Sequence, residues 1–193
     1  MGRTGTKRKM KHIRSYLSTE LPEVRDNELF ANYKTRLPHR LKNIPDDVLE
    51  QWPFEVEVVR KALNQRKDFV HWTYRLVELT SNEILTIRHY PYDESRLFPK
   101  AHEWLSPKGV PLRPIWFDRM LEQGTFIRPI ILAHNANNQV HPILSFEYPA
   151  LDAMFTPYHL LEGNRRLSLL RAMIELKMEG VKERHSVWLV DMG

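Results

Sequence analysis

The chain has 193 residues and a mass of 23.0 kDa, which suits one domain or a core domain with a sizeable extension. Its residues are 42% hydrophobic and 27% charged, so the chain can bury a core and is not disordered by composition. It contains no cysteine, which excludes a disulfide scaffold, a thiolate zinc site and a cysteine nucleophile. No apolar run approaches the ~20 residues of a membrane-spanning helix, and the first residues lack the apolar stretch of a signal peptide. We therefore expect a soluble cytoplasmic protein that makes no membrane contact.

Basic residues near the N-terminus account for the formal net charge of +5. Residues 1–14 carry six of the 29 Lys and Arg residues and none of the 24 Asp and Glu residues, so the rest of the chain has a net charge of −1. The six are Arg3, Lys7, Arg8, Lys9, Lys11 and Arg14. Such an arm can bind nucleic-acid phosphates or anionic lipid, and the alternative is a solvated terminus without a ligand.

The next part of the chain, up to residue 90, predicts two helices and then a β-hairpin. Residues 15–45 show no clean period, and Asp46 and Asp47 then resemble caps of a helix over 46–51. A second helix is predicted to start at Pro53, with Phe54, Val58, Ala62 and Leu63 on one face. Strands are predicted over 70–79 and 84–90, joined by a hairpin loop over 80–83.

Residues 91–114 contain five prolines, which remove backbone donors and interrupt helical periods. The prolines are Pro91, Pro99, Pro107, Pro111 and Pro114. We interpret this segment as an ordered connecting strap that lies against the core through its aromatic residues, and we place the main boundary of the chain here.

The C-terminal part predicts an α+β arrangement with a mixed sheet. Its first helix is expected over 114–123 and ends at Gly124, and a loop over 135–139 joins the first two strands. The helix with the strongest sequence signal is expected over 167–179 and ends at Gly180. The strands are predicted at 126–133, 141–148, 158–161 and 186–190.

One short segment, Glu162-Gly163-Asn164-Arg165-Arg166, combines features that suit the binding of an anion. A strand leads into Gly163 and a helix starts directly afterwards, so unpaired amides and the positive end of the helix dipole face the turn. Gly163 permits a tight turn with close approach of a ligand, and the two arginines add planar donors for phosphate oxygens. Asn164 can cap the helix or bond a ligand, and Glu162 can accept a proton or hold a metal ion.

The same residues also permit a purely structural interpretation. In that alternative Glu162 pairs with Arg166 or Arg165, and Asn164 is an ordinary helix cap. Arg128 opens a predicted strand and either reaches the turn or lies at the edge of the sheet. His159 precedes the turn on a strand and is expected in the core, and the nine histidines show no metal-binding spacing.

The segment Tyr158–Leu170 resembles the central motif of the ParB/sulfiredoxin superfamily, in which a strand leads to a glycine and then to arginines on a helix start. The predicted strand over 126–132 and the closing helix and strand over 165–190 fit the same family. The resemblance covers residues 112–193, and the first 110 residues show no match. It implies three regions: a basic arm (1–14), an α+β extension with a hairpin (15–111) and a ParB-like core (112–193).

The resemblance also implies which activities to expect. Sulfiredoxin-like chemistry needs a cysteine beside the motif glycine, where this chain has Asn164, so that activity is excluded. Chromosome-partitioning members place the triphosphate of CTP on this turn, but they carry a further Glu-Asn motif and a helix-turn-helix that are not found in the 27 residues after Arg166, so a CTP-gated DNA clamp is not expected. Other relatives are nucleases or nucleotide-dependent kinases in which a motif acid is catalytic, and Glu162 corresponds to it. Asn164-Arg165 replaces their frequent His-Arg.

Three functions follow as hypotheses. The first is binding of a nucleotide (CTP, ATP or ADP, with Mg²⁺) on Gly163, Asn164, Arg165, Arg166 and Arg128, with phosphoryl transfer, nucleotide hydrolysis or nuclease activity through Glu162. The second is DNA binding through the basic arm. The third is a protein-interaction component of a bacterial or phage multi-gene system that keeps the fold without catalysis. We leave open whether the chain is an enzyme.

Overall fold

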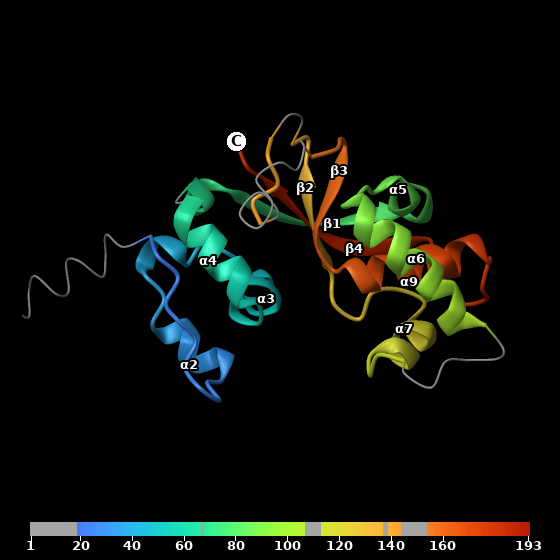
Figure 1. The fold of residues 1–193 in the computed structure, drawn as a ribbon, viewed down its shortest axis with the longest axis horizontal. Coiled ribbons are helices and arrows are strands. Elements are labelled where there is room, and N and C mark those ends of the chain that lie inside the picture. The colour runs from blue at the N-terminus through green and yellow to red at the C-terminus, as the bar shows by residue number, and fades with distance from the viewer. Residues whose placement is uncertain (1–18, 67, 107–112, 137–138, 144–153) are drawn as a thin grey trace, which may run out of the picture. The chain divides into compact units, whose positions relative to one another are not determined.

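A computed structural model describes residues 19–66, 68–106, 113–136, 139–143 and 154–193 (Figure 1). These residues form two compact units, which we describe separately. The first unit comprises the described residues up to Thr73 together with 141–143 and Gly193, and the second comprises the described residues within 74–140 and 154–192. The basic arm lies outside the described residues. Among the described helices, none is long and apolar enough to cross a membrane.

The first unit is helical, with α2 (Phe30–Thr35), α3 (Asp46–Leu49) and α4 (Glu57–Arg66). The predicted helix at 46–51 starts as expected, but after Leu49 the chain continues as a π-helical turn over Glu50–Phe54. Pro53 lies inside that turn, so the prediction that Pro53 starts the next helix is wrong, and α4 begins at Glu57. Short 3₁₀ turns cover His39–Leu41 and Asp68–His71.

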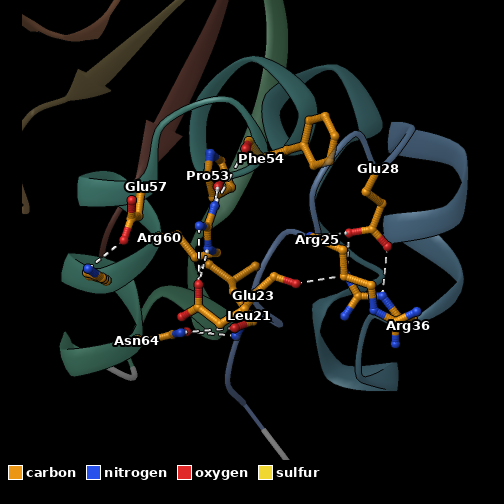
Figure 2. Close-up of polar contacts among 11 residues, drawn as sticks. Leu21, Glu23, Arg25, Glu28, Arg36, Pro53, Phe54, Glu57, Arg60 and Asn64 are labelled. Atoms are coloured by element: carbon orange, nitrogen blue, oxygen red, sulfur yellow. Dashed lines mark hydrogen bonds and ion pairs between the residues drawn. The ribbon is translucent and has the colours of Figure 1, made fainter.

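Polar contacts fasten the extended segment before α2 to α4 (Figure 2). Asn64 exchanges two hydrogen bonds with the backbone of Leu21, at 2.7 and 3.0 Å. Arg60 is only 4% exposed; it donates to the carbonyl oxygen of Pro53 at 2.9 Å and to the carboxylate of Glu23 at 3.3 Å. Burial of a guanidinium costs free energy unless its N–H groups donate hydrogen bonds, so loss of either contact of Arg60 would destabilise the fold. These contacts therefore hold both the extended segment and the π-helical turn against α4.

The second unit contains a four-stranded mixed sheet in the order β1-β4-β2-β3. Its strands are β1 (Thr73–Thr80), β2 (Ile130–His134), β3 (Tyr158–Glu162) and β4 (Arg184–Asp191). β2 runs antiparallel to β3 and parallel to β4, with Leu132 opposite Leu160 and Leu189. β2 is buried along its first four residues, as expected for a central strand made of aliphatic residues. The expected α+β class with a mixed sheet is therefore confirmed.

The predicted hairpin over 70–90 is wrong, because the chain forms a helix after β1. Thr80 caps α5 (Ser81–Thr86): its hydroxyl accepts from the amide of Glu83, and the Glu83 carboxylate accepts from the amide of Thr80 at 2.7 Å. This reciprocal capping box stabilises a helix start where a turn was expected. In place of the second strand, Arg88 alone forms a bridge to His159 on β3.

The interpretation of 91–114 as a connecting strap is also wrong for its first two thirds. Residues Pro91–Leu105 form α6, the longest helix of the described chain, which packs against α9 (Asn164–Glu175; Figure 1). Pro91 occupies the first turn of α6, where no intrahelical donor is lost, and Pro99 lies inside the helix. Buried Ala101 and Trp104 join the core of this unit. Pro107 and Pro111 lie outside the described residues.

Most of the remaining elements match the predictions with shifted bounds, and one predicted strand does not. α7 (Phe117–Gln123) ends at Gly124 in the left-handed conformation, as predicted, whereas the strand predicted from Phe126 begins at Ile130. α9 ends at Glu175, short of Gly180, and Lys177 takes a positive φ of 49° just beyond it. Residues 141–143 are not a strand, and the rest of the predicted strand 141–148 lies outside the described residues.

Candidate functional site

The predicted strand-glycine-helix turn is present at the end of β3. β3 ends at Glu162, Gly163 adopts φ 107° and ψ 28°, and α9 begins at Asn164. The first intrahelical hydrogen bond runs from the Leu167 amide to the Gly163 carbonyl at 2.8 Å. Gly163 therefore occupies the cap position, and Asn164 is the first helical residue rather than the cap of the structural alternative.

A glycine is required at position 163 for two reasons. Its φ of 107° is a conformation that side chains rarely adopt. A Cβ atom there would also lie 2.5 Å from the Cγ2 atom of Ile130, at the start of β2. The turn is thus pressed against the central strand, which fixes the position of the helix start relative to the sheet.

Helix α9 holds the turn rigidly because most of the helix is buried. Its buried apolar residues belong to the core of the second unit: Leu167, Leu169, Leu170, Ala172 and Met173. The first turn of α9 contains no acidic side chain, so none cancels the positive end of its dipole. The N-terminus of α9 is therefore a fixed and electropositive point on the surface.

The turn lines an open pocket of about 260 Å³. The pocket is bounded by Glu162–Arg166 and by half-buried Trp116, which the sequence did not single out. Trp116 precedes α7, far from the turn in sequence, so only the tertiary structure places its ring there. Of the predicted site residues, Glu162, Gly163, Asn164, Arg165 and Arg166 are brought together in this pocket.

The two arginines of the motif have different surroundings. Arg166 has a side chain only 12% exposed, and its Nη1 donates to the carbonyl oxygen of Arg128 at 2.7 Å. Its Nη2 lies 3.7 Å from the Glu162 carboxylate, the ion pair of the structural alternative. Arg165 is exposed, and it forms no hydrogen bond or ion pair within the described part of the chain. The charge available to a ligand is therefore first of all that of Arg165.

Arg128 contributes its backbone carbonyl to the site. Its carbonyl accepts the hydrogen bond from Arg166, which ties the turn to the residues that lead into β2. The pocket lining comes from other residues. Arg128 thus helps to position Arg166 in this structure.

His159 lies in the core, as the sequence predicted. It is 4% exposed, and its Nδ1 accepts a hydrogen bond from the Phe155 amide at 3.3 Å. Burial, assisted by the nearby His89, lowers the pKa of His159 to about 4, so the ring is neutral at physiological pH. Across the described ranges, no group of three or more His, Asp or Glu side chains is arranged to hold a metal ion.

Comparison with known proteins finds no relative: no protein-family model, curated protein or solved structure matches this chain.

Proposed function

We propose that this protein binds the phosphate groups of a nucleotide in the pocket of Glu162–Arg166, in the manner of the ParB/sulfiredoxin proteins that its C-terminal sequence resembles. The observation that carries the proposal is exposed Arg165, which has no partner among the described residues and lines a pocket at the start of a buried helix. A guanidinium beside a helix N-terminus offers both charge and directed donors to phosphate oxygens. Trp116 gives the same pocket an aromatic wall for a base.

The residues of the turn divide the work between binding and support. Arg165 contacts the phosphate. Arg166 holds the turn in place through its hydrogen bond to the Arg128 carbonyl, and its positive charge also attracts the phosphate without direct contact. Glu162 is the carboxylate that lines the pocket, with its side chain 30% exposed. In phosphoryl transfer, nucleotide hydrolysis or nuclease chemistry, Glu162 would take the proton of the attacking hydroxyl or water, or hold Mg²⁺ at the phosphates.

Calorimetric titration with CTP, ATP, ADP and GTP, with and without Mg²⁺, tests the binding. The proposal predicts that one of these nucleotides binds the wild type and that Arg165→Ala removes the binding. Arg119→Ala is the matched control, because Arg119 is an exposed arginine of the same unit, on α7, that does not line the pocket. Binding that survives in Arg165→Ala, or that is absent from the wild type, would contradict the proposal.

Turnover is tested separately, with Glu162→Gln. A catalytic Glu162 predicts that this variant keeps its affinity for the nucleotide and loses the reaction, because the amide neither accepts the proton nor balances a metal charge. Normal turnover in the variant would make Glu162 a structural residue.

A second candidate function is a binding or interaction component without catalysis, and the Glu162–Arg166 ion pair favours it. A carboxylate already engaged with an arginine is a weaker base and a weaker metal ligand than a free one. This alternative predicts nucleotide binding without turnover, and removal of residues 1–14 then tests whether the basic arm supplies any DNA affinity.

A further inference from the structure

A second pocket, of about 480 Å³, adjoins the turn and is lined mainly by α6. Its lining comprises Arg96, Leu97, Lys100, Trp104, Arg113, Pro114 and Arg165. Arg96, Lys100 and Trp104 are spaced by four residues along α6, which places them on one face of the helix. We call this surface the α6 groove.

Among the residues that the structure describes, the lining of the α6 groove contains four cationic side chains and no carboxylate. Arg96 and Arg113 are exposed, as is Arg165, and the Arg113 guanidinium lies over the Phe117 ring at 4.8 Å from its centroid. Lys100 lies 2.7 Å from the carboxylate of Glu103, which is outside the lining. Like charges four residues apart on a helix, such as Arg96 and Lys100, repel each other. Such a concentration of charge is the usual mark of an anionic partner.

The α6 groove and the turn pocket are adjacent. Arg165 lines both of them. Trp104 of the groove and Trp116 of the turn pocket touch edge to face, with ring centroids 6.4 Å apart. A ligand whose phosphate sits on the turn can therefore extend past Arg165 into the groove.

We propose that the α6 groove is a second phosphate-binding subsite of the turn pocket, and that the ligand of the combined site is a single strand of nucleic acid. The inference rests on the proposed function, because it takes the turn as the first phosphate site. Arg96 and Lys100 stand about 6 Å apart along α6 at 1.5 Å per residue, so they form a row of charges that suits a chain of phosphates. A positive groove with an aromatic ring beside it is the usual design for binding a single strand with little sequence preference.

The aromatic rings of the two pockets differ in what they can offer to such a strand. Trp104 is 6% exposed and belongs to the core, where it supports the wall of the groove. Trp116 is half-buried and lines the turn pocket, so it is the ring on which a base would stack. Three of the four cations are arginines, whose planar donors match phosphate oxygens better than a lysine does.

Fluorescence anisotropy with oligothymidylates of increasing length tests the inference. The probes are a mononucleotide, a dinucleotide and strands of about four and about ten nucleotides, since one binding module covers about 4 to 16 nucleotides. The variants are Arg96→Gln/Lys100→Gln in the groove, Arg165→Ala at the turn and Arg119→Gln as the control. Circular dichroism confirms that each variant is folded.

We expect the wild-type affinity to rise with strand length, and the groove variant to lose that rise while it keeps its affinity for a mononucleotide. Loss of two phosphate contacts should lower the slope of log affinity against log salt by about 1.4. If the mononucleotide binds but longer strands bind no tighter, the inference is overturned and the proposed function stands. If strands bind Arg165→Ala as tightly as the wild type, both the inference and the proposed function are overturned. A glutamate homopolymer that competes as well as the strand of equal length would show attraction of charge alone and would also overturn the inference.

Discussion

Replacement of Gly163 by alanine provides the sharpest test of how the turn is built. The added Cβ atom would lie 2.5 Å from Ile130 Cγ2 and 3.0 Å from Ile130 Cβ, both well inside van der Waals contact. The residue would also have to keep φ near 107°, or move the start of α9. The alanine side chain therefore raises the free energy of the folded state in two ways, through a steric clash with Ile130 and through a strained backbone conformation.

The size of the effect follows from these two costs. A left-handed conformation costs a non-glycine residue about 1–2 kcal/mol, and forcing a methyl group into a packed contact costs about 1–3 kcal/mol more. Gly163→Ala should thus lower the free energy of unfolding by about 2–5 kcal/mol. Gly180→Ala isolates the backbone cost, because Gly180 has φ 83° but nothing within 4 Å of its added Cβ. That control should lose only about 1–2 kcal/mol.

Urea unfolding of the wild type and of both variants, followed by circular dichroism, measures the two free energies. The difference between Gly163→Ala and Gly180→Ala reports the contact with Ile130 alone. If the two variants are equally stable, the turn is not pressed against β2, and the argument that this contact fixes the helix start fails.

Two further predictions concern the stability of the same unit. Arg166→Ala should lower the free energy of unfolding by about 1.5–3 kcal/mol, because it removes a charged donor from the Arg128 carbonyl, whereas Arg165→Ala should change it by less than about 0.5 kcal/mol; equal losses in urea unfolding would refute this division. Because the pKa of His159 is lowered to about 4 in the folded state, the unfolded chain takes up the proton first, so stability should fall as the pH drops from about 6.5 towards 4, by on the order of 3 kcal/mol at the lower end. Unfolding midpoints across this range should vary less in His159→Gln, and an unchanged pH dependence would show that His159 does not cause it.

The turn could be predicted from the sequence because its signals are local. A short, mostly apolar run before Glu162, a glycine, and a helical period from Leu167 onward all fall within a few residues of one another. Gly163 has a conformation that few other residues adopt, so the presence of a glycine at this position by itself indicates a turn. The α+β class followed from the same kind of pattern, repeated along the C-terminal part.

The two largest errors arose where a local signal had two meanings. Thr80-Ser81-Asn82-Glu83 was interpreted as a hairpin loop, although Thr followed three residues later by Glu is also the pattern of a capping box. The prolines of 91–105 were taken as helix breakers, but Pro91 lies in the first turn of α6, where a proline is tolerated. Pro99 lies inside α6, and the packing of α6 against α9 offsets its cost. Burial of Ala101 and Trp104 favours the helix enough to outweigh the proline.

The sequence motif does not predict which of its arginines is available to a ligand, because that depends on tertiary structure. Two adjacent arginines are equivalent in a sequence pattern, yet neighbouring residues on a helix point about 100° apart. That rotation directs Arg166 to the Arg128 carbonyl and leaves Arg165 exposed at the boundary of two pockets. The α6 groove could not be predicted from the sequence either, because its charged residues come from three separate segments: α6, the segment before α7, and α9. The α6 groove could therefore not be predicted once residues 91–105 were interpreted as a strap, since only a helix places Arg96 and Lys100 on one face beside Arg165.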